Sequence, residues 1–203
     1  MKRILVTSLL PFLLVSTQGS MPAKQKLETA VFAGGCFWCV QPVFDYIKGV
    51  KSSIAGYANG KGQDPTYEDY AEMGFVEAVE VTYDPSQTTY EELLENFWKQ
   101  IDPTDQGGQF VDRGPQYRPA IFWLTEAQKK AAEKFKDTMS KSGKYDKPIV
   151  VEISKFANFY PAEEYHQEYH KKNPLNYSIY RMGSGRDQYI KKIWGNFKGN
   201  SKR

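Results

Sequence analysis

The chain has 203 residues and is poor in the side chains that hold metals or build disulfide frameworks, with two cysteines and two histidines. Two cysteines close at most one bridge within a chain, so a fold held together by several disulfides is excluded. The charges nearly cancel, with 27 Lys and Arg against 24 Asp and Glu. A net charge of +3 provides no electrostatic footprint for nucleic acid. The composition, 40% hydrophobic and 15% aromatic, is sufficient for one globular core.

Long apolar runs are also scarce, and the one that stands out, Ile4 to Val15, is too short to span a bilayer as a helix. A basic tripeptide precedes it and small polar residues follow it. This layout is typical of a secretory signal peptide, with a cut expected after Gly19. We therefore expect a signal at 1–19, a single domain at 20–203, and a periplasmic or secreted protein without stable membrane association. The alternative is a disordered or buried N-terminal helix.

Both cysteines lie in one short motif, Gly34-Gly35-Cys36-Phe37-Trp38-Cys39. An apolar run leads into it and apolar residues follow at helical spacing, which predicts a strand, a two-glycine turn and a helix that opens at Cys36. Backbone amides at a helix start favour an anion, so we expect a lowered pKa and a nucleophilic thiol at Cys36. Cys36 and Cys39 share one helix face and can close a disulfide if their side chains turn together.

Other interpretations of the cysteine pair stay open on spacing alone. The two thiols can simply fill buried space, or they can combine with His166 and His170 in a zinc site. The histidines are four residues apart, but they lie more than 120 residues from the cysteines, far outside the spacing of zinc fingers. A disulfide enclosing two residues would constrain little of the unfolded chain. The pair is therefore better interpreted as redox-active than as structural.

Periodicity predicts alternating strands and helices after the signal, in an α+β domain with helices packed against a mixed sheet and the site at one end. A long loop rich in glycine and proline is expected at 102–118, and the tail from 173 to 195 lacks clear periodicity. Strands are expected near 28–33, 50–57, 76–83, 119–124 and 149–153. Helices are expected near 36–48, after a Thr88 or Thr89 cap, and at 125–140, and a helix or helical turn is expected at 159–172.

Five further segments follow the cysteine motif in a fixed order. They are Gly56-Tyr57-Ala58-Asn59-Gly60, Pro65-Thr66-Tyr67, Glu77-Ala78-Val79 with Tyr83-Asp84-Pro85, Gln116-Tyr117-Arg118, and the run from Phe159 to Gln167. Together the six segments resemble the A-type peptide methionine sulfoxide reductases over about residues 27–196. The resemblance implies a ferredoxin-like core of two βα units with extensions. It also implies reduction of the S-epimer of methionine sulfoxide, free or in oxidised proteins, without a metal or bound cofactor and with an external dithiol such as thioredoxin.

The resemblance also implies roles for individual residues. Cys36 attacks the sulfoxide sulfur and becomes a sulfenic acid, which Cys39 is placed to convert to a disulfide. Glu77 protonates the sulfoxide oxygen, so its pKa must be raised by burial. The other implied site residues are Tyr57 and Tyr117, whose hydroxyls contact the same oxygen, Phe37 and Trp38, which line the methyl pocket, Asp112, which orients the substrate peptide group, and His166, which supports the site or touches the substrate.

Three positions depart from the family pattern. Cys39 stands where the family usually has glycine, which predicts recycling within the first helical turn. The tail carries Ser184 rather than a resolving cysteine, and Phe75 stands where histidine is usual. If the pocket holds Cys39 away from Cys36, an external thiol must resolve the sulfenic acid. His170 is expected at the surface.

Two other functions compete with this one. A thiol-disulfide oxidoreductase of thioredoxin type would use the same cysteine pair on protein disulfides and would give Glu77 no role. A non-enzymatic module that binds methionine-rich partners in an aromatic pocket would keep its function after Cys36→Ser.

Overall fold

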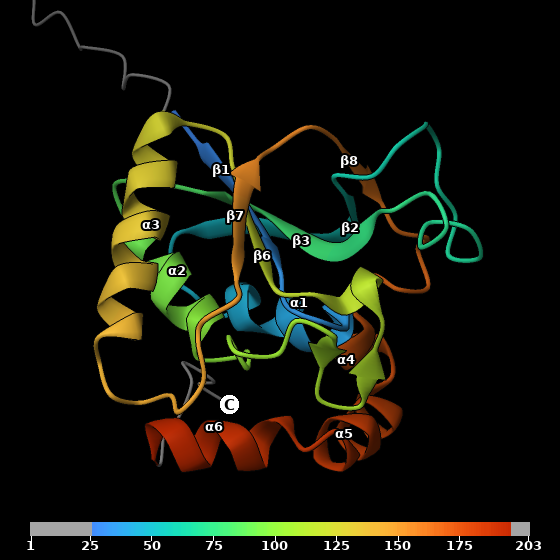
Figure 1. The fold of residues 1–203 in the computed structure, drawn as a ribbon. Helices are drawn as coiled ribbons and strands as arrows, with labels where there is room; N and C mark the ends of the chain where they lie inside the picture. The colour runs from blue at the N-terminus through green and yellow to red at the C-terminus, as the bar shows by residue number, and fades with distance from the viewer. Residues whose placement is uncertain (1–25, 196–203) are drawn as a thin grey trace, which may run out of the picture.

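The computed structural model describes residues 26–195, so the expected signal at 1–19 lies outside the described residues. Its centre is a six-stranded sheet in the order β7-β6-β1-β3-β2-β8, antiparallel except for the parallel pair of β6 and β7 (Figure 1). The predicted mixed sheet is confirmed. The strands are β1 (Glu28–Ala33), β2 (Val50–Ala58), β3 (Val76–Tyr83), β6 (Ala120–Trp123), β7 (Glu152–Lys155) and β8 (Phe159–Pro161), and β4 (Gly108–Gln109) pairs with β5 (Asp112–Arg113) in a separate hairpin.

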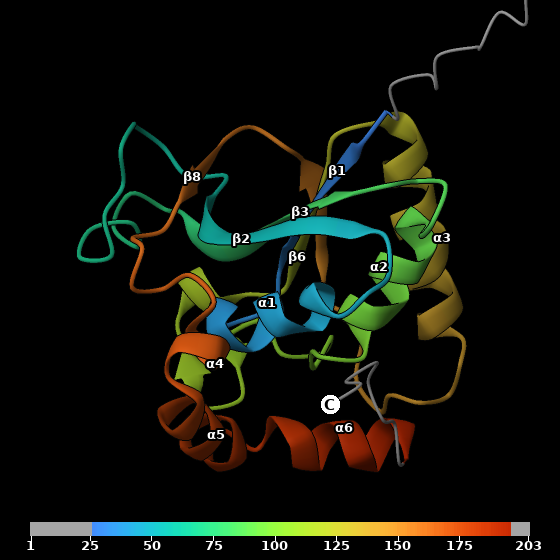
Figure 2. The ribbon, with the colours of Figure 1, turned by 180° about the vertical axis from the view of Figure 1, so that it is seen from behind.

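The order of the elements confirms the ferredoxin-like core. Along the chain, β1, α1, β2, β3, α2 and β6 form two βαβ halves, and in the sheet their strands stand in the order β6-β1-β3-β2. Helices α5 and α6 form a layer on the far side of α1 from the sheet (Figure 2). The helices are α1 (Phe37–Asp45), α2 (Tyr90–Trp98), α3 (Glu126–Ser140), α4 (Tyr169–Lys172), α5 (Pro174–Gly183) and α6 (Arg186–Trp194), with a 3-10 turn η1 (Pro115–Tyr117).

An aromatic core fixes α1 and α2 on the sheet. The ring of Phe32 on β1 stacks against Phe44 of α1 at 5.2 Å and against Phe97 of α2 at 4.9 Å between centroids. All three side chains are fully buried, and burial of each stabilises the fold by roughly 1.5–3 kcal/mol. Because these rings hold α1 against β1, the turn between them has a fixed geometry.

Two helix starts agree with the sequence prediction. The Thr89 side chain accepts a hydrogen bond from the backbone N–H of Glu92, and Thr125 does the same for Gln128. Each cap satisfies an amide that has no partner within its helix, which stabilises the helix by about 1 kcal/mol. Of the two threonines considered for the first cap, the structure selects Thr89.

The helix or helical turn predicted at 159–172 is wrong at its start. Residues Phe159–Pro161 form strand β8, which pairs with Gly56–Ala58 at the edge of β2, and only the short α4 follows. Gly56 permits this close pairing, because a Cβ there would lie 2.4 Å from the ring of Phe159 and from the carbonyl oxygen of Tyr160. Backbone pairing with a free sheet edge thus outweighs the helical pattern.

Other boundaries shift by a few residues. Helix α1 ends at Asp45 rather than near 48, and β7 begins three residues later than predicted. The tail that lacked clear periodicity forms α5 and α6. Within the described residues, no helix is long and apolar enough to cross a membrane.

Candidate active site

Cys36 lies at the N-cap of α1, and Gly34 and Gly35 connect it to the end of β1 at Ala33. The preceding Gly35 has φ +80°, and a Cβ on it would lie 2.5 Å from Cβ of Gln109. Glycine therefore lets the chain turn tightly against the 102–118 loop. The Cys36 side chain ends up 8% exposed at the first helical turn, where the sequence predicted it.

Glu77 on β3 is buried next to the start of α1. Its Oε2 accepts the backbone N–H of Phe37 at 2.9 Å, and its Oε1 accepts the hydroxyl of Tyr70 at 3.0 Å. Burial raises the pKa of Glu77 to about 8, although both hydrogen bonds lower it. The carboxyl group therefore holds a proton at neutral pH, which agrees with the acid role expected from the sequence.

The pKa of the Cys36 thiol is raised well above its ordinary value, because the group is buried and because Glu77 and Cys39 lie close to it. The expectation that the helix start lowers this pKa is wrong. The first free amide of α1 is donated to Glu77, and burial outweighs the helix dipole. Proximity of the thiol to an acid that keeps its proton is the central geometric feature of the site.

Two tyrosine hydroxyls face Glu77, and one of them differs from the prediction. Tyr117 lies within hydrogen-bonding range of Glu77, and Tyr70 is the other donor. The Tyr57 hydroxyl instead donates to Oε2 of Glu163 at 2.7 Å. Tyr57 and Glu77 are directly opposite each other on β2 and β3, but the stronger acceptor for the Tyr57 hydroxyl comes from the loop after β8. Tyr57 therefore contributes its ring to the site, stacked on Tyr70 at 4.5 Å.

Tyr180 on α5 is a site residue that the sequence did not reveal. Its hydroxyl donates to Oδ2 of Asp112 at 2.6 Å and is hydrogen-bonded to the Cys36 thiol. Burial raises the pKa of Asp112, and the Tyr180 hydrogen bond opposes that rise. The predicted loop acid is thus linked to the nucleophile through Tyr180. Nothing in the aperiodic tail separated this tyrosine from the thirteen others in the chain.

An aromatic wall stands beside the thiol. Trp38 stacks on Tyr169 with centroids 3.8 Å apart and planes 6° from parallel, and its Nε1 donates to Nδ1 of His166 at 3.1 Å. The Phe37 ring lies 4.9 Å from His166. Burial lowers the pKa of His166, so the ring is neutral and can accept the indole proton. His166 supports Trp38, and the two predicted pocket aromatics lie together beside Cys36.

Metal binding receives no support from the described residues, where no group of three or more His, Cys, Asp and Glu side chains is placed to hold an ion.

The expectation that His170 lies at the surface is wrong. Its side chain is buried, and its Nε2 lies 3.2 Å from Oδ2 of Asp45 at the end of α1. A buried carboxylate partner accounts for the burial of this ring.

Cys39 is fully buried, one helical turn after the nucleophile. Its backbone N–H donates to the carbonyl oxygen of Cys36 at 3.0 Å, and both thiols are free. The carboxyl-terminal helices hold this turn from outside. Arg181 of α5 donates to the Cys39 carbonyl at 3.2 Å, and the fully buried Arg186 of α6 donates to the carbonyl of Gly34 at 3.1 Å.

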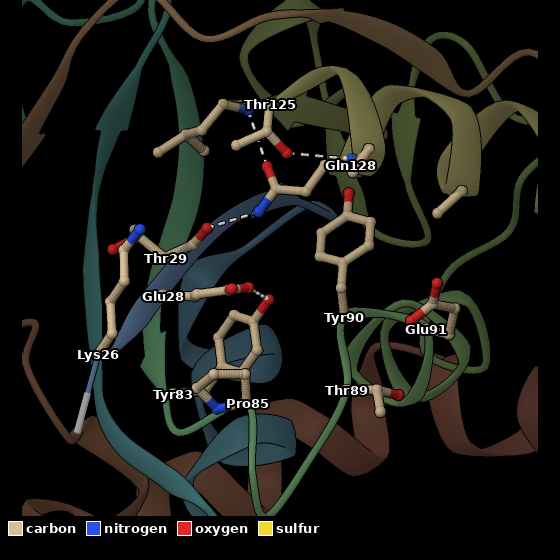
Figure 3. Close-up of a pocket in the computed structure, with 13 residues that line it drawn as sticks. Lys26, Glu28, Thr29, Tyr83, Pro85, Thr89, Tyr90, Glu91, Thr125 and Gln128 are labelled. Atoms are coloured by element: carbon tan, nitrogen blue, oxygen red, sulfur yellow. Dashed lines mark hydrogen bonds between the residues drawn. The ribbon is translucent and has the colours of Figure 1, made fainter. Parts of the chain in front are cut away.

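A cavity of about 640 Å³ lies at the other end of β1 (Figure 3). Glu28 at the start of the strand accepts the Tyr83 hydroxyl there, and the Gln128 side-chain amide donates to the Thr29 carbonyl. Since only Gly34 and Gly35 separate Cys36 from the last residue of β1, the cavity and the cysteines lie at opposite ends of the strand. These polar groups pair with one another, and the cavity contains none of the predicted site residues.

The fold and the site together define a class of protein. A buried thiol with a second thiol one turn away, a carboxyl group that keeps its proton and an aromatic wall are the parts of a thiol-dependent oxidoreductase that protonates its substrate.

Comparisons with known proteins identify the family. Residues 28–198 match the family model described as peptide methionine sulfoxide reductase. The chain is 51% identical to the MsrA of Halalkalibacterium halodurans, over 85% of this chain and 99% of that one, and 49% identical to the MsrA of Bacillus licheniformis, over 84% and 96%. The chain therefore belongs to the peptide methionine sulfoxide reductase family, which confirms the resemblance found in the sequence.

Solved structures agree with this assignment. Mxr1 of Saccharomyces cerevisiae in its reduced form superposes with a TM-score of 0.69 at 32% identity, covering 79% of this chain and 92% of that one. Methionine sulfoxide reductase A of Corynebacterium diphtheriae gives 0.66 at 31% identity, covering 79% and 81%. Mxr1 has also been solved in complex with Trx2, with a TM-score of 0.52 at 27% identity to this chain, covering 76% and 91%.

Proposed function

We propose that this protein reduces the S-epimer of methionine sulfoxide, free and in proteins, with Cys36 as nucleophile and Glu77 as proton donor. The observation that carries the proposal is the buried carboxyl group of Glu77. Its pKa of about 8 keeps it protonated at neutral pH, and it is hydrogen-bonded to the residue that follows Cys36. Such a group can donate a proton to an oxygen that a carboxylate would repel.

The chemistry follows from this arrangement. The Cys36 sulfur attacks the sulfoxide sulfur and an S–S bond forms, while the oxygen takes the thiol proton and the Glu77 proton and leaves as water. A water molecule then attacks the Cys36 sulfur and returns a proton to Glu77, the S–S bond breaks, and methionine departs. Cys36 is left as a sulfenic acid, so the sulfoxide is reduced by two electrons and the cysteine is oxidised by two. The Tyr117 hydroxyl stabilises the oxygen, the Tyr70 hydroxyl holds Glu77 in place, and Phe37 and Trp38 enclose the methyl group.

Cys39 resolves the sulfenic acid. Its thiolate attacks the Cys36 sulfur, an S–S bond forms, and the hydroxyl group leaves as water after taking a proton. The position of Cys39 in the same helical turn as Cys36 supports this role, because no long movement of the chain is needed to bring the sulfurs together.

An external dithiol then reduces the disulfide, and a thioredoxin-like protein is the donor that we propose. The support is the yeast relative solved in complex with Trx2.

We also propose that 1–19 is a signal peptide and that the protein acts in the periplasm or is secreted, on the basis of the basic start and apolar run in the sequence. Amino-terminal sequencing of the exported protein would test this, because a chain beginning at Met1 would contradict it.

The reaction is tested with the mature protein, dithiothreitol and separated epimers of a methyl sulfoxide. We expect turnover of the S-epimer alone and complete loss of turnover in Cys36→Ser. Turnover of both epimers would refute the stereochemical assignment, and turnover in Cys36→Ser would refute the nucleophile.

The resolving role is tested with Cys39→Ser as the matched thiol-to-hydroxyl change. We expect one equivalent of methionine per protein, as in the wild type, and poor recycling with thioredoxin. Unchanged recycling would remove Cys39 from the reaction.

A further inference from the structure

Helix α5 presents polar side chains to the protein and apolar side chains to solvent, the reverse of the usual pattern. Its outward residues occupy one face, at positions i, i+4 and i+7, and its inward residues occupy the opposite face. The outward residues are Leu175, Ile179 and Met182, exposed by 71%, 59% and 61%, and the inward residues are the half-buried Tyr177, Tyr180 and Arg181.

The inward residues lie against the two cysteines. Tyr180 is hydrogen-bonded to the Cys36 thiol, and Arg181, the next residue, donates from Nη1 to the carbonyl oxygen of Cys39. Tyr180 and Arg181, two consecutive residues of α5, thus contact the two cysteines at the start of α1. The reaction proposed above gives neither Tyr180 nor Arg181 a part in the chemistry.

The guanidinium of Arg181 is held in place on three sides. Besides its bond to the Cys39 carbonyl, Nη2 donates to Oε1 of Gln100 at 2.9 Å and Nε donates to Oδ1 of Asp187 at 2.7 Å. Its side chain is 14% exposed. A planar, permanently charged group with several fixed partners keeps its charge at a defined place.

This charge acts on Cys39. Burial lowers the pKa of Arg181, but the nearby Cys39 and Tyr177 together with Asp187 raise it above its ordinary value. The guanidinium is therefore close enough to the Cys39 side chain to interact with it electrostatically, and it is hydrogen-bonded to the carbonyl oxygen of the same residue. A thiolate formed at a fully buried cysteine needs such a partner, because burial by itself disfavours the charge.

We propose that Arg181 is a positioning residue for the resolving step, holding the Cys39 turn in place and stabilising the Cys39 thiolate as it attacks the sulfenic acid of Cys36. The proposal rests on the function proposed above. In this step the Cys39 S–H and the Cys36 S–OH become one S–S bond and one molecule of water. No other oxidant is needed, and the external dithiol that later reduces the disulfide is the donor already named.

The test separates the two half-reactions in Arg181→Met, which removes the charge but keeps the length, and in Arg181→Lys, which keeps the charge. Fully reduced protein receives excess methionine S-sulfoxide without reductant. Methionine release reports on Cys36, loss of free thiols reports on disulfide formation, and dimedone labelling followed by mass spectrometry detects the sulfenic acid. Lys141→Met, which breaks an exposed ion pair with Asp137 on α3, is the control for loss of a surface charge.

We expect Arg181→Met to release one equivalent of methionine at the wild-type rate. Its disulfide should form about tenfold more slowly, as for a thiol whose thiolate fraction falls about tenfold, and a dimedone adduct should accumulate at Cys36. Arg181→Lys should restore most of the rate, and Lys141→Met should match the wild type. Disulfide formation at the wild-type rate in Arg181→Met would overturn the proposal, and so would Arg181→Lys being as slow as Arg181→Met.

A second variant, Asp187→Asn, tests the proposal if Arg181→Met does not fold. It leaves the Arg181 guanidinium in place and replaces one charged partner with a neutral one. We expect disulfide formation in this variant at least as fast as in the wild type, and slower formation would overturn the proposal. This experiment also distinguishes failure of this proposal from failure of the proposed function. If the proposed function is wrong, the wild-type protein itself releases no methionine.

Discussion

The backbone N–H of Phe37 donates to Oε2 of Glu77 at 2.9 Å and thereby ties the first residue of α1 to the middle of β3. The free amide of a helix start, which the sequence suggested would serve the Cys36 thiolate, is used by the neighbouring acid instead. The helix start therefore orients the Glu77 carboxyl group, and burial raises the pKa of the Cys36 thiol beside it.

Glu77→Gln should fold normally, because the amide oxygen can still accept the Phe37 N–H, but should slow sulfoxide reduction by about a hundredfold, the usual contribution of a general acid. The wild type loses its acid as pH rises through about 8. The ratio of wild-type to Glu77→Gln rates should therefore be largest below pH 8 and fall above it. Single-turnover rates from pH 6 to 9.5 measure this ratio, and a ratio near one at every pH would remove Glu77 from the mechanism.

The same carboxyl group should make folding stability depend on pH. Burial raises its pKa from 4.5 to about 8 in the folded protein, so the folded state binds the proton more tightly than the unfolded state. This contribution favours folding fully below pH 4.5 and is lost as pH rises toward 8. Each tenfold difference in proton affinity between the two states corresponds to about 1.4 kcal/mol, so the total loss is a few kcal/mol. Urea unfolding at several pH values should show this decline in the wild type and a shallower one in Glu77→Gln. Equal slopes would contradict the raised pKa.

Tyr70→Phe should reduce the rate of sulfoxide reduction several-fold, because the hydroxyl that donates to Glu77 is lost while the stacked ring stays. Tyr57→Phe is the matched control. It removes a hydroxyl bonded to Glu163, so we expect a smaller effect on single-turnover reduction and a loss of about 1 kcal/mol in stability. If Tyr57→Phe impairs the chemistry more than Tyr70→Phe, the assignment of the two hydroxyls is wrong.

Gly35→Ala should be more costly than Gly143→Ala, although both glycines have positive φ. At Gly143 nothing lies within 4 Å of an added Cβ, so only backbone strain of about 1–2 kcal/mol is expected. At Gly35 the added carbon would also lie 2.5 Å from Cβ of Gln109 and would displace the turn that carries Cys36. Thermal unfolding of both variants measures the difference in stability. Equal losses of stability would show that the loop containing Gln109 moves aside without an energetic penalty.

The sequence predicted those parts of the molecule in which local and tertiary signals agree. Strand β3 has its predicted bounds, Thr89 caps a helix as expected, and the helix predicted at 125–140 begins one residue later. The glycine turn leads into α1 at Cys36. In each case, periodicity or side-chain capping favours the same structure as the packing does.

The parts that sequence reasoning missed depend on contacts between distant segments. Strand β8 forms because β2 offers an unpaired edge, and Tyr57 donates to Glu163, which lies 106 residues away in the chain. In α5 the apolar residues face outward, so hydrophobic periodicity could not reveal that Tyr180 and Arg181 face the cysteines. This helix makes its contacts with the site through polar groups. The usual rule that the apolar face of a helix is the buried face therefore does not apply to it.

Arg186 connects the last described helix to Gly34, near the beginning of the fold, through a single buried hydrogen bond. A polypeptide still being synthesised, with this arginine inside the ribosomal exit tunnel, has both cysteines but lacks the contacts that α5 and α6 supply to them. The assembled site is therefore one of the last features that a newly made molecule acquires.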